Sequence, residues 1–62
     1  MTHAELLLEY DRSHGTRLVP TLRQFAAAGG DVRACSRQLR IHPNTLGYRL
    51  KRIAQIAGLS PS

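Results

Sequence analysis

A cluster of cationic and hydrogen-bonding side chains lies in the stretch IHPNTLGYRLKRI, residues 41–53. Its members are His42, Asn44, Thr45, Tyr48, Arg49, Lys51 and Arg52. Residues 32–62 carry six lysines and arginines and no acid, whereas residues 1–31 carry three arginines and four acids. Such one-sided charge favours an anionic partner, of which nucleic acid is the commonest and a membrane surface the next. The alternative interpretation is a basic face that contacts only solvent.

The sequence gives no sign of a catalytic, metal or cofactor site. His3, His14 and His42 do not share helical spacing, and the chain has no cysteine pair to complete a zinc site. Glu9 and Asp11 lie too close along one segment to face each other across a cleft, and 62 residues build little of a pocket. We therefore expect a protein that is not an enzyme and that needs no metal and no cofactor.

Size and composition predict one small domain over residues 1–62. A chain of this length buries only about 60% of its unfolded surface, and without Trp its core must consist mainly of Leu, Ile, Val and Ala. The single cysteine, Cys35, forms no internal disulfide and is interpreted as a small buried apolar residue. No run suits a membrane span or a signal peptide, so we expect a cytoplasmic location and no membrane partner.

Helical spacing dominates the sequence and predicts an all-α fold with four helices, of which residues 1–31 form two supporting ones. The first covers about residues 2–13 and ends before Gly15, with Leu6, Leu7 and Tyr10 on one face. The second follows Thr16 as its N-cap, tolerates Pro20 in its first turn, and ends at the glycine pair 29–30. Its predicted buried stripe consists of Leu18, Leu22, Phe25 and Ala26.

Residues 32–57 predict two further helices joined by a tight turn. Asp31 caps the shorter one, about residues 32–39, which places Val32, Cys35, Ser36 and Leu39 inward and Arg33, Arg37 and Arg40 outward. The longer one begins at Pro43, after His42, and runs to about Ala57 before Gly58, and the tail 60–62 is expected to fray. Its inward stripe is Leu46, Leu50, Ile53 and Ala57.

Two helices joined in this way are the layout of a helix-turn-helix, whose second helix enters the major groove of DNA. The second helix here would present a polar first turn to base edges, and its N-terminus favours a phosphate. The predicted core of the motif comprises Leu39, Ile41, Leu46, Leu50 and Ile53.

The stretch GGDVRACSRQLRIHPNTLGYRLKRI resembles the C-terminal helix-turn-helix domain of PucR-type and CdaR-type bacterial transcription regulators and, more distantly, the Fis-type motif. The upstream LLEYDRSHGTRLVPTLRQF is similar to the lead-in of the same family. The resemblance implies sequence-specific binding of double-stranded DNA. It also implies a position at the C-terminus of longer proteins whose upstream regions sense signals.

Three positions depart from the family pattern. Ser36 replaces a usual Ala, and Arg40 stands where many such turns have Gly, at a cost of about 1 kcal/mol if the turn is left-handed. We therefore expect another turn geometry. Gly47 occupies a position where relatives often carry Arg, which removes one DNA contact and lowers helix propensity by about 1 kcal/mol relative to Ala.

The expected contacts with DNA fall into two groups. Contacts to bases or the groove are expected from His42, Asn44, Thr45, Gly47, Tyr48 and Lys51. Contacts to phosphates are expected from Arg33, Arg37, Arg49 and Arg52. Arg49 has an equally weighted structural alternative, an ion pair with Asp11 or Asp31 that ties its helix to the scaffold.

Because one recognition helix buries little surface, we expect a homodimer that reads two half-sites. The rival from another class is a helical module for protein interaction or dimerisation. RNA binding ranks lower, because exposed aromatic platforms for stacking on bases are lacking.

Overall fold

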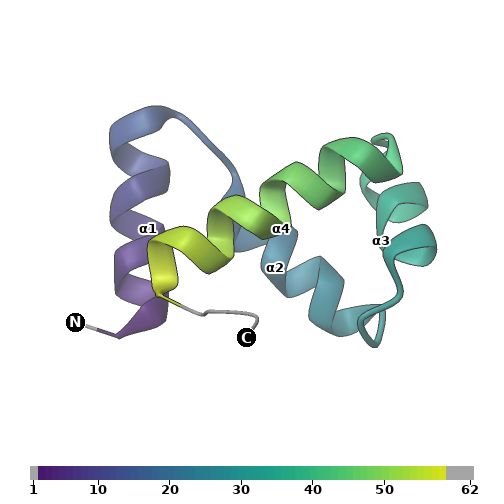
Figure 1. The fold of residues 1–62 in the computed structure, drawn as a ribbon, viewed down its shortest axis with the longest axis horizontal. Coiled ribbons are helices and arrows are strands. Elements are labelled where there is room, and N and C mark those ends of the chain that lie inside the picture. Colours follow the sequence, from purple (N-terminus) through teal and green to yellow (C-terminus); the bar gives the residue numbers. More distant parts are fainter. Residues whose placement is uncertain (1, 59–62) are drawn as a thin grey trace.

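The computed structural model describes residues 2–58 and contains four α-helices. They are α1 His3–His14, α2 Leu18–Ala27, α3 Val32–Leu39 and α4 Pro43–Ala57 (Figure 1). The all-α class is confirmed, since residues 2–58 contain no strand. The tail 60–62, expected to fray, lies outside the described residues.

The longest helix, α4, packs against all three others. Helix α2 also contacts both α1 and α3, whereas α1 and α3 lie at opposite ends of the molecule (Figure 1). The described helices thus form a layer 30 × 28 × 19 Å in extent, with α4 along its length. None of these helices is both long and apolar enough to cross a bilayer.

Local signals set both ends of α1. The Thr2 hydroxyl accepts from the backbone N–H of Glu5 (3.1 Å), and the Glu5 carboxylate accepts from the backbone N–H of Thr2 (3.2 Å). This reciprocal capping box satisfies two free donors of the first turn. Gly15 ends the helix in the left-handed region (φ 66°), as its position predicts.

The start of α2 differs from the prediction, because Thr16 is not its N-cap. The helix begins after Arg17, whose side chain caps nothing, and Thr16 instead donates its hydroxyl to the Asp11 carboxylate (2.5 Å). The two oxygens of that carboxylate accept from the backbone N–H groups of Leu18 (2.8 Å) and Val19 (2.9 Å). A residue of α1 therefore caps α2 and fixes the angle between the two helices.

This orientation changes which residues of α2 are buried. Leu18 is buried and Phe25 is half-buried as predicted, but Leu22 and Ala26 are exposed. Thr21 takes the inward position instead, 1% exposed, and its hydroxyl donates to the Arg17 carbonyl (2.7 Å). Hydrophobicity alone predicts burial of Leu22 in preference to Thr21. A threonine can nevertheless be buried when its hydroxyl is hydrogen-bonded within its own helix.

The bounds of α3 and α4 agree with the prediction. The Asp31 carboxylate accepts from the backbone N–H of Ala34 (3.1 Å), and Gly58 ends α4 with φ 70°. Cys35 and Ser36 are buried, but Val32 is 38% exposed and does not join the core. Val32 is the first residue of α3.

The turn between α3 and α4 is left-handed despite the arginine there. Arg40 has φ 56° and ψ 45°, so the expectation of another turn geometry was wrong. The Arg40 N–H donates to the carbonyls of Arg37 and Ser36, and the Ile41 N–H donates to the Ser36 carbonyl (3.0 Å). These bonds satisfy carbonyls at the end of α3 and offset the conformational cost of about 1 kcal/mol.

The core forms where α4 meets α1 and α2. Leu7, Leu18 and Ile53 are its buried centre, and Tyr10, Val19, Leu50 and Ile56 pack against them. Leu46 and Cys35 are fully buried, and Ala57 is 5% exposed. The predicted inward stripe of α4 is therefore confirmed, with Leu50 at its edge.

The Asp11 cap makes a prediction for stability. Asp11→Ala should lower the free energy of unfolding by about 2 kcal/mol, the upper range for a lost N-cap, because several donors lose their acceptor. Thermal unfolding measures this. Glu9→Ala is the matched control, since its exposed ion pair with Arg12 should contribute less than about 1 kcal/mol.

The same residue predicts an acid dependence. Partial burial raises the pKa of Asp11, but hydrogen bonds from Thr16, Val19 and Leu18 outweigh it and bring the pKa below its ordinary value of 3.8. The stabilisation is therefore complete above about pH 4 and is lost as the pH falls through the lowered pKa. Equal acid sensitivity of the wild type and Asp11→Ala would contradict this assignment.

Candidate nucleic-acid interface

The first turn of α4 is built by the sequence His42-Pro43-Asn44. Pro43 occupies the first helical position, where its missing N–H is not needed. The backbone N–H of Asn44 donates to Nδ1 of His42 (3.0 Å), so the His42 side chain is the N-cap. This bond turns Nε2 of His42 away from the helix end. The side chains of His42 and Asn44 are both exposed.

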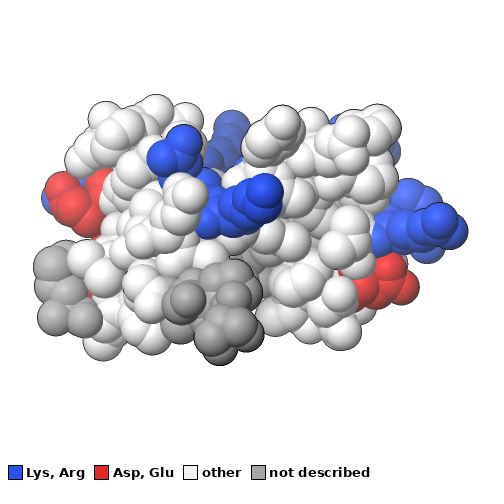
Figure 2. Space-filling view, in the orientation of Figure 1, with Lys and Arg blue, Asp and Glu red and all other residues white. Residues whose placement is uncertain are grey.

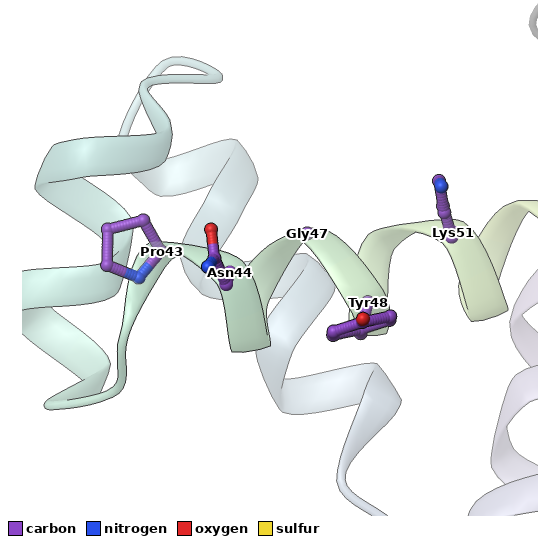
Figure 3. A pocket seen from close by; sticks show the side chains of 5 residues that line it. All are labelled: Pro43, Asn44, Gly47, Tyr48 and Lys51. Atoms are coloured by element: carbon purple, nitrogen blue, oxygen red, sulfur yellow. The ribbon is translucent and has the colours of Figure 1, made fainter.

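One face of α4 carries exposed polar side chains. Asn44, Thr45 and Lys51 are exposed, and Tyr48 is 76% exposed. In Figure 3, Asn44 and Lys51 project to the same side of the helix, and the backbone of Gly47 lies between them. The sequence-based assignment of this face to the outside is therefore correct.

Gly47 leaves a hollow on this face. A shallow concavity is lined by Pro43, Asn44, Gly47, Tyr48 and Lys51 (Figure 3). A Cβ atom built on Gly47 would meet no neighbouring atom within 4 Å. The absence of a side chain at residue 47 is therefore not required by packing.

Three of the four predicted phosphate-binding arginines are exposed. Arg33 and Arg37 lie on α3, and Arg52 lies on α4. Basic side chains gather over the α3 end and the middle of the molecule in Figure 2, while acidic ones lie at the α1 edge and below α3. The middle of this face is thus basic, whereas basic and acidic side chains lie next to each other at the α3 end.

Arg49 differs from the other arginines because it reaches toward the scaffold. It is half-buried, and its guanidinium donates to the hydroxyl of Thr21 on α2 (3.5 Å). The expected partner was wrong: Asp11 accepts from Thr16, Leu18 and Val19, and Asp31 accepts from Ala34. This hydrogen bond nevertheless agrees better with a structural role for Arg49 than with a phosphate contact.

The predicted motif core lies behind the polar face. Leu46 and Ile53 are buried, and Leu39, Ile41 and Leu50 are half-buried. Burial also raises the pKa of the Cys35 thiol, consistent with an apolar filling residue rather than a nucleophile. Among residues 2–58, no three His, Cys, Asp or Glu side chains gather as metal ligands would.

Sequence reasoning missed two positioning residues, Asp11 and Thr21. Both act between helices: Asp11 of α1 accepts from the start of α2, and Thr21 of α2 accepts from Arg49 of α4. A hydrogen bond between the side chains of Gln24 and Gln38 adds a link from α2 to α3. The available signal was the lead-in LLEYDRSHGTRLVPTLRQF, which is similar to that of the family. It contains both Asp11 and Thr21 but does not indicate what they bind.

Comparison with known proteins gives one family and several relatives. The family described as the PucR C-terminal helix-turn-helix domain matches residues 18–62. The DNA-binding transcriptional activator AdeR of Bacillus subtilis is 53% identical over 51 residues, which are 82% of this chain and 12% of AdeR. An uncharacterized protein of Mycobacterium tuberculosis is 46% identical over 48 residues, 77% of this chain and 12% of that protein. No solved structure matches significantly.

The contrast between Arg49 and Arg52 gives a prediction about roles. Arg49→Ala should lower the free energy of unfolding by about 1 kcal/mol, because Thr21 loses a partner and the arginine stem loses its packing. Arg52→Ala, three residues along on the exposed side, should change it by less than about 0.5 kcal/mol. Thermal melting of both variants measures the difference, and equal melting temperatures would contradict a scaffold role for Arg49.

Proposed function

The chain belongs to the family of PucR C-terminal helix-turn-helix domains, and on this premise we propose that it binds double-stranded DNA sequence-specifically as the DNA-binding part of a bacterial transcription regulator. The observation that carries the proposal is the division of α4 into two faces. One face packs on all the other helices, and the other presents polar side chains of the first two turns with no protein partner among the described residues.

The proposed docking places the N-terminal half of α4 in the major groove. In this motif the first residues of the second helix approach base edges while neighbouring elements contact the backbone. Asn44, Thr45 and Tyr48 are exposed in that half, Lys51 is exposed just beyond it, and His42 presents its free ring edge beside them. We propose that the exposed arginines of α3, Arg33 and Arg37, contact phosphates at the groove edge.

The chain spans 12% of the length of its curated relative AdeR. Catalysis, location, further regions and assembly are therefore proposals. We propose that this chain is not an enzyme and that it acts in the cytoplasm, where bacterial DNA lies. An upstream sensory region and a homodimeric state complete the proposal. The homodimeric state is supported by interface size, because a single module buries too little surface to bind DNA tightly.

A protein-interaction role remains the second candidate, and it rests on α1. Leu8 is 53% exposed there and lines a shallow groove with Glu5, Glu9 and Arg12. This surface lies on a different helix from the proposed DNA face, so a contact between protomers at α1 is compatible with DNA binding by α4.

Salt dependence separates the two candidates. Binding to a selected duplex should weaken steeply as salt rises, because exposed arginines displace counterions from phosphates, with a log–log slope of about −0.9 per phosphate neutralised. Arg37→Ala should make the slope about one unit shallower at all sequences. Fluorescence titration at several salt concentrations measures both slopes, and affinity independent of salt would contradict the proposal.

Asn44 and Leu46 lie on opposite faces of the same turn and give a matched pair of variants. Asn44→Ala should weaken binding to the preferred site by about 1–3 kcal/mol, through loss of a base contact, while the melting temperature stays nearly unchanged. Leu46→Ala should lower the free energy of unfolding by about 2–5 kcal/mol, because Leu46 is fully buried. The face assignment fails if Asn44→Ala unfolds the domain and Leu46→Ala leaves it intact.

The dimer proposal predicts the form of the operator. Sites selected from a random DNA pool by the intact regulator should contain inverted repeats with half-sites about 34 Å apart, or a multiple of that distance. Sequencing of the selected pool measures the spacing. Selected sites that consist only of single half-sites would argue against the dimer.

A further inference from the structure

The hollow at Gly47 lies in the middle of the face proposed to enter the major groove. Its lining residues 43, 44, 47, 48 and 51 follow the spacing of one helical face, with Asn44 before Gly47 and Lys51 after it. Pro43 and Tyr48 bring a saturated ring and an aromatic ring to the same surface (Figure 3). The hollow is therefore shallow, open toward solvent and bounded by apolar as well as hydrogen-bonding groups.

No structural requirement explains a glycine at residue 47. Its φ is not among the positive values of this chain, and a Cβ atom there would meet nothing within 4 Å apart from the helix's own backbone. Glycine inside a helix is less favourable than alanine, and no close packing compensates for it here. The space that the missing side chain leaves is consequently open to a ligand that approaches from outside the protein.

The residues that line the hollow match one chemical group in the major groove, the C5-methyl of thymine. The amide of Asn44 matches the N6 donor and N7 acceptor of adenine, so its preferred base pair contains a thymine. The thymine C5-methyl is the apolar group that a major-groove edge offers to an apolar contact. Gly47 lies three residues beyond Asn44, about 4.5 Å along the helix axis, which compares with about 3.4 Å between neighbouring bases.

We propose that the Gly47 hollow receives the C5-methyl group of a thymine in the half-site, so that Gly47 determines sequence preference by the absence of its side chain. This inference rests on the proposed binding of duplex DNA by α4. It assigns to one position a preference for thymine over cytosine, because cytosine carries a hydrogen instead of the methyl group at C5 and an amino donor instead of the O4 acceptor.

Replacement of thymine by deoxyuridine tests the inference, because it deletes only the methyl group. Each thymine of a selected site is replaced in turn, and binding is titrated with the wild type, Gly47→Ala and Gln55→Ala. Gln55 is exposed on the same helix, beyond the proposed contact region, and serves as the control. Gly47→Ala should melt no lower than the wild type, so a loss of binding cannot reflect unfolding.

The wild type and Gln55→Ala should lose about fourfold in affinity at one thymine per half-site, the ratio expected for one buried methyl group. Gly47→Ala should bind the thymine site more weakly, and its thymine-to-deoxyuridine ratio should fall to one or below. The inference is overturned if no replacement affects the wild type, or if Gly47→Ala retains the fourfold ratio, although duplex binding itself would stand in both cases. Failure of the wild type to bind any selected duplex would overturn the proposed function as well.

Discussion

Burial of one stripe of α4 against the other three helices is the interaction on which the rest of this domain depends. Leu46, Ile53 and Ala57 are all nearly inaccessible, and they belong to the helix whose opposite face carries the candidate DNA contacts. In a chain without Trp, little other apolar area is available to hold the helices together. The helix that would read DNA is thus also the central structural element, and its rotation about its own axis is fixed by the core.

Polar contacts then set the angles that apolar burial leaves free. Asp11 fixes α2 relative to α1 by accepting from two N–H groups of α2, and Thr21 accepts from Arg49 of α4. The left-handed Arg40 sets the direction from α3 into α4 at a local conformational cost. These links relate the α3 arginines to the α4 face as one rigid surface, which matters because phosphate contacts position a protein and base contacts specify the sequence.

Most of the fold could be predicted because its signals are local. Asp31, Pro43, Gly15 and Gly58 each act within a few residues of where they stand, and the stripe of α4 follows from spacing alone. Predictions failed where a side chain of one helix bonds to another helix. The cap of α2 comes from Asp11 rather than from adjacent Thr16, and the resulting orientation buries Thr21 instead of Leu22. The outward face of α4 was predictable, but the inward reach of Arg49 to a threonine of another helix was not.

The proposed DNA-binding surface is the face of α4 opposite its core stripe. Backbone amide shifts of the ¹⁵N-labelled protein, recorded while a selected duplex is added, test it most directly. The account predicts the largest changes at Asn44, Thr45, Gly47, Tyr48 and Lys51, with smaller ones along α3 and little change at Leu8 on α1. Changes concentrated around Leu8, with the first two turns of α4 unaffected, would contradict it.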